Sequence, residues 1–162
     1  MTNKDLIRNA FAGSDMIVDN YLKGLKKEDL LIRAVPGMNH VAWQMGHLIS
    51  SERALLNKIK PDAAPALPAG FDEAHSTANH ESDDASRFHA PEEYLAIWKP
   101  IRAATLKLLD ETPDEGLDRE DPSFPPIART VGQLFHLLAT HPVLHAGQFV
   151  AVRRKLGLPI AF

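Results

Sequence analysis

Four segments of the chain carry apolar residues at the three- and four-residue spacing of an amphipathic helix. They cover about residues 6–25, 41–59, 91–111 and 130–156. No segment keeps the two-residue alternation that is typical of a half-buried strand. The pattern therefore predicts four helices and no sheet.

The residues at the ends of these segments support the helical interpretation. Asn39 is a plausible N-cap for the second helix, and Pro61 follows its end. Pro91 occupies a position favoured in the first turn of the third helix. Thr130, with Gln133 three residues later, matches a capping box for the fourth.

Two long connections separate the predicted helices. Residues 61–90 are rich in Pro, Ala and Asp and are too long for a plain turn, so we expect a crossover or a covering loop. Residues 112–129 contain four prolines and form a second such loop. Amphipathic helices without strands favour an all-α four-helix bundle, and a chain of 162 residues fits one domain over 1–162.

The composition of the chain limits its partners and the residues that could bind a metal. The net charge is -3, and the main cationic cluster is formed by Arg153, Arg154 and Lys155. So little positive charge disfavours nucleic acid as a partner. The sequence contains no run of about 18 apolar residues, the length that predicts a membrane span. We expect a cytoplasmic protein. Since the chain has no cysteine, any metal ligands must be His, Asp or Glu.

His141 and His145 stand one helical turn apart, so both imidazoles can reach one ion. The segment between them lacks the glutamate of the zinc-protease motif His-Glu-x-x-His, which disfavours that class of protease. The pair shares its stripe with Leu138 and Phe149, where an imidazole needs a partner or a metal. The spacing alone is equally compatible with two histidines that bind nothing.

A third ligand has to come from another helix. His47 lies in the middle of the second helix, whereas His40 lies near its cap and is expected to be solvated. His136 is interpreted as packed or partly exposed. Three further histidines fall in the first long connection, where solvation is the favoured interpretation: His75, His80 and His89.

Two segments together resemble a known family. PGMNHVAWQMGHLISSE (36–52), followed far downstream by TVGQLFHLLATHPVLHAGQFVAVRRKLGLP (130–159), is similar to the DinB/YfiT-like superfamily of metal-dependent enzymes. The resemblance implies a four-helix bundle, often dimeric, with a bound divalent ion, for which imidazole ligands suit zinc, nickel or iron. It also implies that His47, His141 and His145 are the metal ligands.

The resemblance further implies a small-molecule substrate. Some members of the superfamily are S-transferases for low-molecular-weight thiols such as bacillithiol or mycothiol, and a related metal-assisted hydrolysis is a second possibility. Three imidazoles leave at least one coordination position open, as catalytic sites require. The alternative hypothesis is a non-enzymatic helical protein whose histidines bind a structural metal, or none. The resemblance assigns no catalytic residue.

Pro142 departs from the resemblance, because many relatives carry Glu at this position. A proline inside a helix removes a hydrogen bond to the Leu138 carbonyl and costs about 3 kcal/mol. One interpretation divides the segment into two helices at Pro142. The other is a bend that aims His141 at the ion, while the freed carbonyl of Leu138 or a neighbour accepts an imidazole N–H.

Several other side chains are candidates for the surroundings of the site. Trp43 is interpreted mainly as core, with a pocket wall as the alternative, and Gln148 as a residue that orients a ligand or forms an internal hydrogen bond. Glu52 is expected to pair with an arginine across the bundle or to be exposed. Arg153 and Arg154 are expected to complement the helix dipole, with steering of an acidic substrate as the alternative.

Overall fold

The computed structural model describes residues 1–160 and consists mainly of helices. The long ones are α1 (Asn3–Leu22), α2 (Val41–Ile59), α4 (Pro91–Glu111) and α5 (Val131–Lys155). The short ones are α3 (Phe71–Ala74) and the 3-10 turns η1 (Asp29–Leu31), η2 (Thr77–Asn79), η3 (Ala85–Arg87) and η4 (Asp114–Asp118). Apart from an isolated bridge between Glu120 and Thr130, residues 1–160 contain no β-structure. The predicted all-α class is confirmed.

The helix ends follow the local sequence at most positions. The capping box of Thr130 and Gln133 is present, and Pro91 stands in the first turn of α4, as predicted. α1 ends at Leu22, a few residues earlier than expected. The expectation that Asn39 caps α2 is wrong, because His40 is the N-cap and its Nδ1 accepts the backbone N–H of Trp43 at 3.0 Å.

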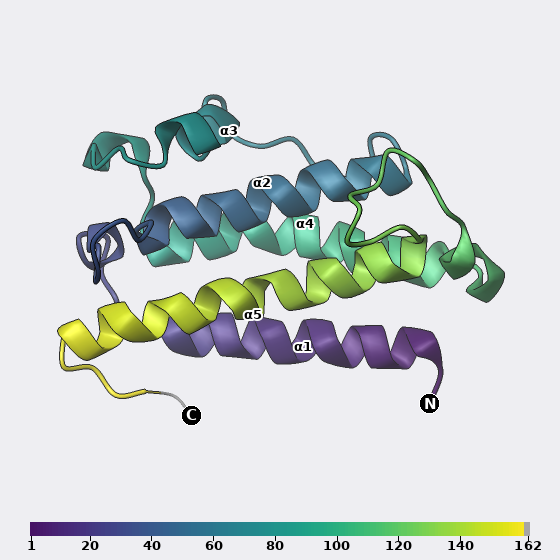
Figure 1. The fold of residues 1–162 in the computed structure, drawn as a ribbon, viewed down its shortest axis with the longest axis horizontal. Helices are drawn as coiled ribbons and strands as arrows, with labels where there is room; N and C mark the ends of the chain where they lie inside the picture. Colours follow the sequence, from purple (N-terminus) through teal and green to yellow (C-terminus); the bar gives the residue numbers. More distant parts are fainter. Residues whose placement is uncertain (161–162) are drawn as a thin grey trace.

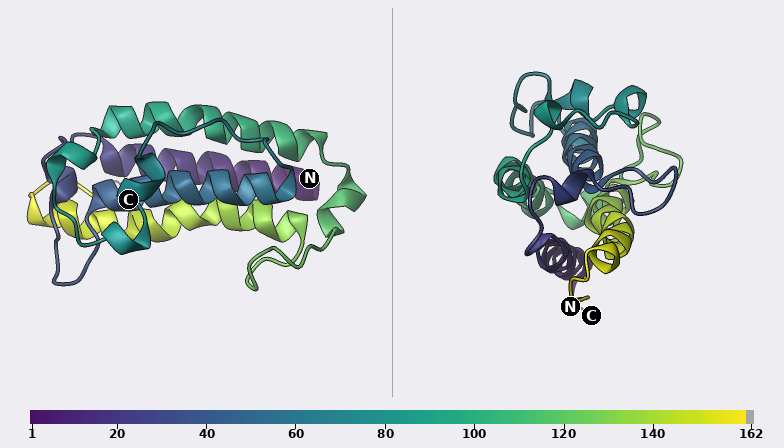
Figure 2. Two further views of the ribbon diagram at one scale, coloured as in Figure 1. Left: turned by 90° about the horizontal axis from the view of Figure 1, so that it is seen from above. Right: turned by 90° about the vertical axis from the view of Figure 1, so that its left-hand side faces the viewer.

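The four long helices lie side by side. α1 packs along α5, and α2 packs against both α4 and α5 (Figure 1). Seen end-on, the long helices surround a common centre, with α3 outside them (Figure 2). The buried apolar side chains form two clusters along this centre, one represented by Ile49, Tyr94 and Phe149 and the other by Leu56, Leu134 and Phe135.

The connection between α2 and α4 covers the outer side of α2. It contains α3, and its apolar side chains Phe71 and Phe88 are buried. In Figure 1 it runs above α2, on the side opposite α1. The periodic pattern did not predict α3, because four residues are too few to establish a period. The connection is therefore packed against the helices that it joins.

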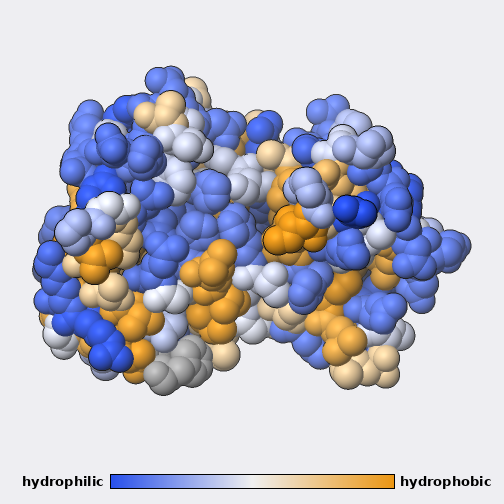
Figure 3. Space-filling model, in the orientation of Figure 1, coloured by the Kyte–Doolittle hydropathy of each residue, from blue (hydrophilic) through white to orange (hydrophobic). Residues whose placement is uncertain are grey.

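The outer surface of the protein is mixed in character. Figure 3 shows a largely hydrophilic face with separate hydrophobic patches. Within residues 1–160, no helix has both the length and the apolar character needed to cross a bilayer.

A group of buried polar side chains joins α2 to α4 in the core. Glu52 is 3% exposed and accepts hydrogen bonds from Trp98 Nε1 at 2.6 Å and Thr105 Oγ1 at 2.7 Å. Its carboxylate lies 3.3 Å from Nη1 of Arg102. Nε of the same arginine lies 3.1 Å from the carboxylate of Asp15. Burial raises the pKa of Glu52, against the opposing effect of the Arg102 charge. The expected pairing of Glu52 with an arginine across the bundle is confirmed.

Candidate metal centre

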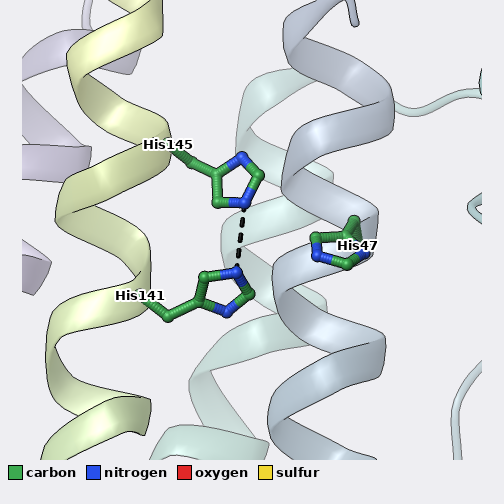
Figure 4. Close-up of side chains that lie close together, drawn as sticks. All are labelled: His47, His141 and His145. Carbon is green, nitrogen blue, oxygen red and sulfur yellow. Dashed lines mark hydrogen bonds between the residues drawn. The ribbon is translucent and has the colours of Figure 1, made fainter. Parts of the chain in front are cut away.

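The packing of α2 against α5 brings together the three histidines expected to bind metal. His47 projects from α2, while His141 and His145 project from successive turns of α5. In Figure 4 the rings of His141 and His145 extend from α5 toward α2, and the ring of His47 lies beside them in front of α2. The side chains are half-buried, so the centre lies near the surface.

The spacing of the imidazole nitrogens suits a single ion. One nitrogen from each residue lies within 4.8 Å of the others. Nε2 of His141 and Nε2 of His145 are 3.1 Å apart, joined by the hydrogen bond drawn in Figure 4. Imidazole nitrogens that share a tetrahedral zinc ion lie about 3.3 Å apart, because each bond is about 2.0 to 2.1 Å long. A movement of roughly 1.5 Å by the His47 ring would bring its nitrogen to that spacing.

The electrostatics of the centre keep the imidazoles in the form that binds metal. Burial lowers the pKa of His141 and of His145 to about 4, with a smaller contribution from the neighbouring histidines. Burial also lowers the pKa of His47. The rings are therefore neutral near pH 7, and each has a lone pair on one nitrogen.

Trp43 orients the ring of His47. The two rings are stacked, with centroids 5.0 Å apart and planes inclined by 8°. Trp43 is itself fixed by the hydrogen bond from Nε1 to the carbonyl of Ser76, at 3.0 Å. It is buried, as its interpretation as core predicts, and it also forms one wall of the candidate centre. The segment after α3 thus acts on His47 through a single aromatic side chain.

Gln44 contacts the centre and was missed from the sequence. Its Oε1 lies 2.9 Å from Nδ1 of His145, and its Nε2 donates to the carbonyl of Asn39 at 2.6 Å. Gln148, the glutamine considered from the sequence, is exposed. Gln44 precedes His47 by three residues, which places both on nearly the same face of α2. That spacing was the available signal.

The remaining histidines correct two expectations. His40 and His75 were expected to be solvated, but both are buried. Nε2 of His40 donates to the carbonyl of Ser82 at 2.9 Å, so this ring caps α2 and also holds the covering connection. His80 and His89 are partly buried, and His136 is exposed.

The ring of His75 packs directly against the backbone of α2. It is 2% exposed and lies against Gly46, whose missing Cβ leaves the space that it fills. Its Nδ1 donates to the Phe71 carbonyl, and its Nε2 accepts the hydroxyl of Tyr94, each at 2.8 Å. The sequence places His75 in a polar, proline-rich segment, which favours solvation. It does not reveal the contact with α2 that buries the ring.

α5 is a single helix across Pro142, so its division into two helices is wrong. Pro142 is buried inside the helix, between the two histidines. The imidazole N–H of His145 is directed at Gln44 rather than at the Leu138 carbonyl. The described hydrogen bonds thus give the freed carbonyl no role in holding a ligand.

Arg153 has a structural role at the end of α5. It is buried, and its Nη1 donates to the carbonyls of Tyr21 and Lys23 at 3.0 and 2.8 Å. Its Nε donates to the carbonyl of Pro159 at 2.9 Å. Arg153 therefore ties the end of α1 to the end of α5 and is not available to steer a substrate, whereas Arg154 is exposed.

Comparison with known proteins gave one family. The sequence model of the DinB superfamily matches residues 10–149, a range that includes all three histidines of the candidate centre. No curated protein and no solved structure gives a significant match.

Proposed function

The chain belongs to the DinB superfamily, and from that premise we propose that it binds one divalent metal ion through His47, His141 and His145. The ion belongs to the group that imidazole ligands suit, such as zinc, nickel or iron. We further propose that the four long helices are the four-helix bundle of this superfamily and that residues 1–162 form one domain. A homodimer and a cytoplasmic location stay predictions.

One observation carries the proposal. Three neutral imidazoles from two helices lie within 4.8 Å of one another at a half-buried position. Neutral imidazole is the ligand form of histidine, and the lowered pKa values keep it available near pH 7. Three protein ligands also leave at least one position for a substrate atom, which closed structural sites do not.

We propose that the centre transfers a low-molecular-weight thiol to an electrophile, with a related metal-assisted hydrolysis as the other reaction. A divalent ion at this centre would supply Lewis acidity, lowering the pKa of a coordinated thiol or water. The chain contributes the orientation of the ligands through Trp43 and Gln44.

The alternative is a non-enzymatic helical protein whose histidines bind a structural metal, or none. One observation favours it. His141 and His145 already bond to each other, and His145 bonds to Gln44, so two of the three rings have protein partners. These hydrogen bonds allow the two rings to be stable at this half-buried position without an ion.

Metal stoichiometry tests the proposed ligands. Protein without a histidine tag is loaded with zinc, nickel or iron, dialysed, and analysed for metal per chain. We expect one ion in the wild type and a loss of stoichiometric metal in His47→Ala, His141→Ala and His145→Ala. His136→Ala is the matched control, because it removes an exposed imidazole from the same helix as two of the ligands.

Two further measurements decide between the candidate functions. Circular dichroism of each variant shows whether metal is lost while the helices remain. Metal that disappears only together with folded structure would favour the structural role. A panel of small thiols with an electrophilic dye then tests transfer, and no turnover by metal-loaded protein with any thiol would refute the S-transferase proposal.

A further inference from the structure

Gln44 connects His145 to the backbone of the chain ahead of α2. The side chain is 0% exposed, and both ends of its amide have a partner. Nε2 lies 2.6 Å from the carbonyl oxygen of Asn39, and Oε1 lies 2.9 Å from Nδ1 of His145. A buried amide satisfied at both ends is held in one orientation.

The orientation of this amide follows from its partners. The oxygen of Asn39 is a carbonyl and can only accept, so the amide nitrogen of Gln44 must face it. The amide oxygen therefore faces His145, and it too can only accept. Nδ1 of His145 must then carry a hydrogen.

We infer that Gln44 is a positioning residue, which fixes the tautomer of His145 so that its Nε2 lone pair points at the metal position before any ion binds. This inference rests on the proposed function. A neutral imidazole carries one N–H, so a hydrogen fixed on Nδ1 leaves Nε2 bare. Metal-binding histidines generally donate their second N–H to such a partner, and the partner holds both the tautomer and the ring orientation.

The tautomer of His145 also determines the tautomer of His141. Nε2 of His141 lies 3.1 Å from Nε2 of His145, and one of these nitrogens must donate to the other. Since Nε2 of His145 is bare, the hydrogen belongs to Nε2 of His141. To bind an ion through that nitrogen, His141 must move its hydrogen to Nδ1. His145 is thus preset for the ion, whereas His141 changes tautomer when the ion enters.

Nitrogen NMR of the metal-free protein tests the tautomers directly. Long-range proton–nitrogen correlation spectra distinguish the protonated from the bare nitrogen of each imidazole, and His→Ala variants assign the signals. We expect the hydrogen of His145 on Nδ1 and that of His141 on Nε2. A hydrogen on Nε2 of His145 in the wild type would overturn the inference, whether or not the protein binds metal.

Gln44→Leu tests the effect on the centre. It removes the acceptor while retaining an apolar side chain of similar size, and Gln148→Leu is the matched control on the exposed side of α5. In the metal-free state we expect Gln44→Leu to remove the preference of His145 for Nδ1–H. We also expect zinc affinity about 10- to 100-fold weaker than in the wild type, with Gln148→Leu unchanged.

The outcomes separate this inference from the proposed function. Wild-type zinc affinity in a folded Gln44→Leu protein would refute the positioning role while leaving the metal centre intact. A wild type that binds no divalent ion would refute the proposed function. In that case a shift in the His145 tautomer in Gln44→Leu would still show that Gln44 fixes the ring, and an unchanged tautomer would overturn the inference as well.

Discussion

A methyl group added at Gly46 is expected to loosen the contact between α2 and α3. In Gly46→Ala the new Cβ would come closer than 3.0 Å to ring atoms of His75, a separation that real Cβ atoms essentially never show. The ring has no free space to move into, because it is 2% exposed and hydrogen-bonded through both nitrogens. It must leave its position, and the contact of α3 with α2 must loosen.

The contacts of His75 set the expected loss in the free energy of unfolding. Displacing His75 removes its hydrogen bonds to the Phe71 carbonyl and the Tyr94 hydroxyl, each worth about 1 kcal/mol. Overpacking of a fitted contact contributes a further 1 to 3 kcal/mol, roughly. Alanine is a better helix former than glycine by about 1 kcal/mol, which opposes the loss. We expect Gly46→Ala to lower the free energy of unfolding by about 2 to 4 kcal/mol.

Urea unfolding followed by circular dichroism measures this change. Gly147→Ala is the matched control, because this glycine lies in α5 with no heavy atom within 4 Å of the added Cβ. We expect this control to gain roughly 0.5 to 1 kcal/mol. In a His75→Ala background the clash is absent, so the same Gly46→Ala change should no longer destabilise. Equal effects of Gly46→Ala in both backgrounds, or a stability equal to the wild type, would refute the reasoning.

Three further predictions concern His75, Glu52 and Pro142. Burial lowers the pKa of His75 from 6.5 to about 4, so protonation favours the unfolded chain. The contribution of the neutral ring is complete above pH 6.5 and is lost as the pH falls toward 4. The stability difference between wild type and His75→Gln in urea titrations should accordingly shrink by about 3 kcal/mol over that interval, and a constant difference would contradict this account. Glu52→Ala removes one of the two carboxylates paired with Arg102 and the acceptor of two buried hydrogen bonds, and should lower the free energy of unfolding by about 3 kcal/mol. Glu52→Gln, which can still bond to Trp98 and Thr105, should lose less in the same assay. Pro142→Ala restores a hydrogen bond to the Leu138 carbonyl and should raise the melting temperature. If the proline also aims His141, calorimetric titration with zinc should show weaker binding, and unchanged affinity would exclude that role.

Periodicity located the long helices because each buries one continuous stripe over many turns. The predicted range 91–111 coincides with α4, and the second helix ends before Pro61 as expected. The capping box of Thr130 was readable because both partners lie within four residues. Such features depend on neighbours in the chain, which the sequence records directly.

The roles of single polar side chains were not readable in the same way. His75 and His40 lie in or beside polar segments, yet both are buried, because the connection folds back over α2. Gln148 is close to His145 in the sequence, but the hydrogen-bond partner of His145 is Gln44, 101 residues away. A hydrogen bond of this kind depends on the register of α2 against α5, which no local pattern encodes.

The helical class, most boundaries of the long helices and the one-turn spacing of His141 and His145 follow from the order of the amino acids, because they depend on the period of a helix and on residues close together in the chain. The tertiary structure alone decided that His47 meets that pair, that Trp43 and Gln44 hold two of the three rings, and that His75 fills the space beside Gly46. These relations arise when distant segments pack together, and the packing depends on the shapes of many side chains at once.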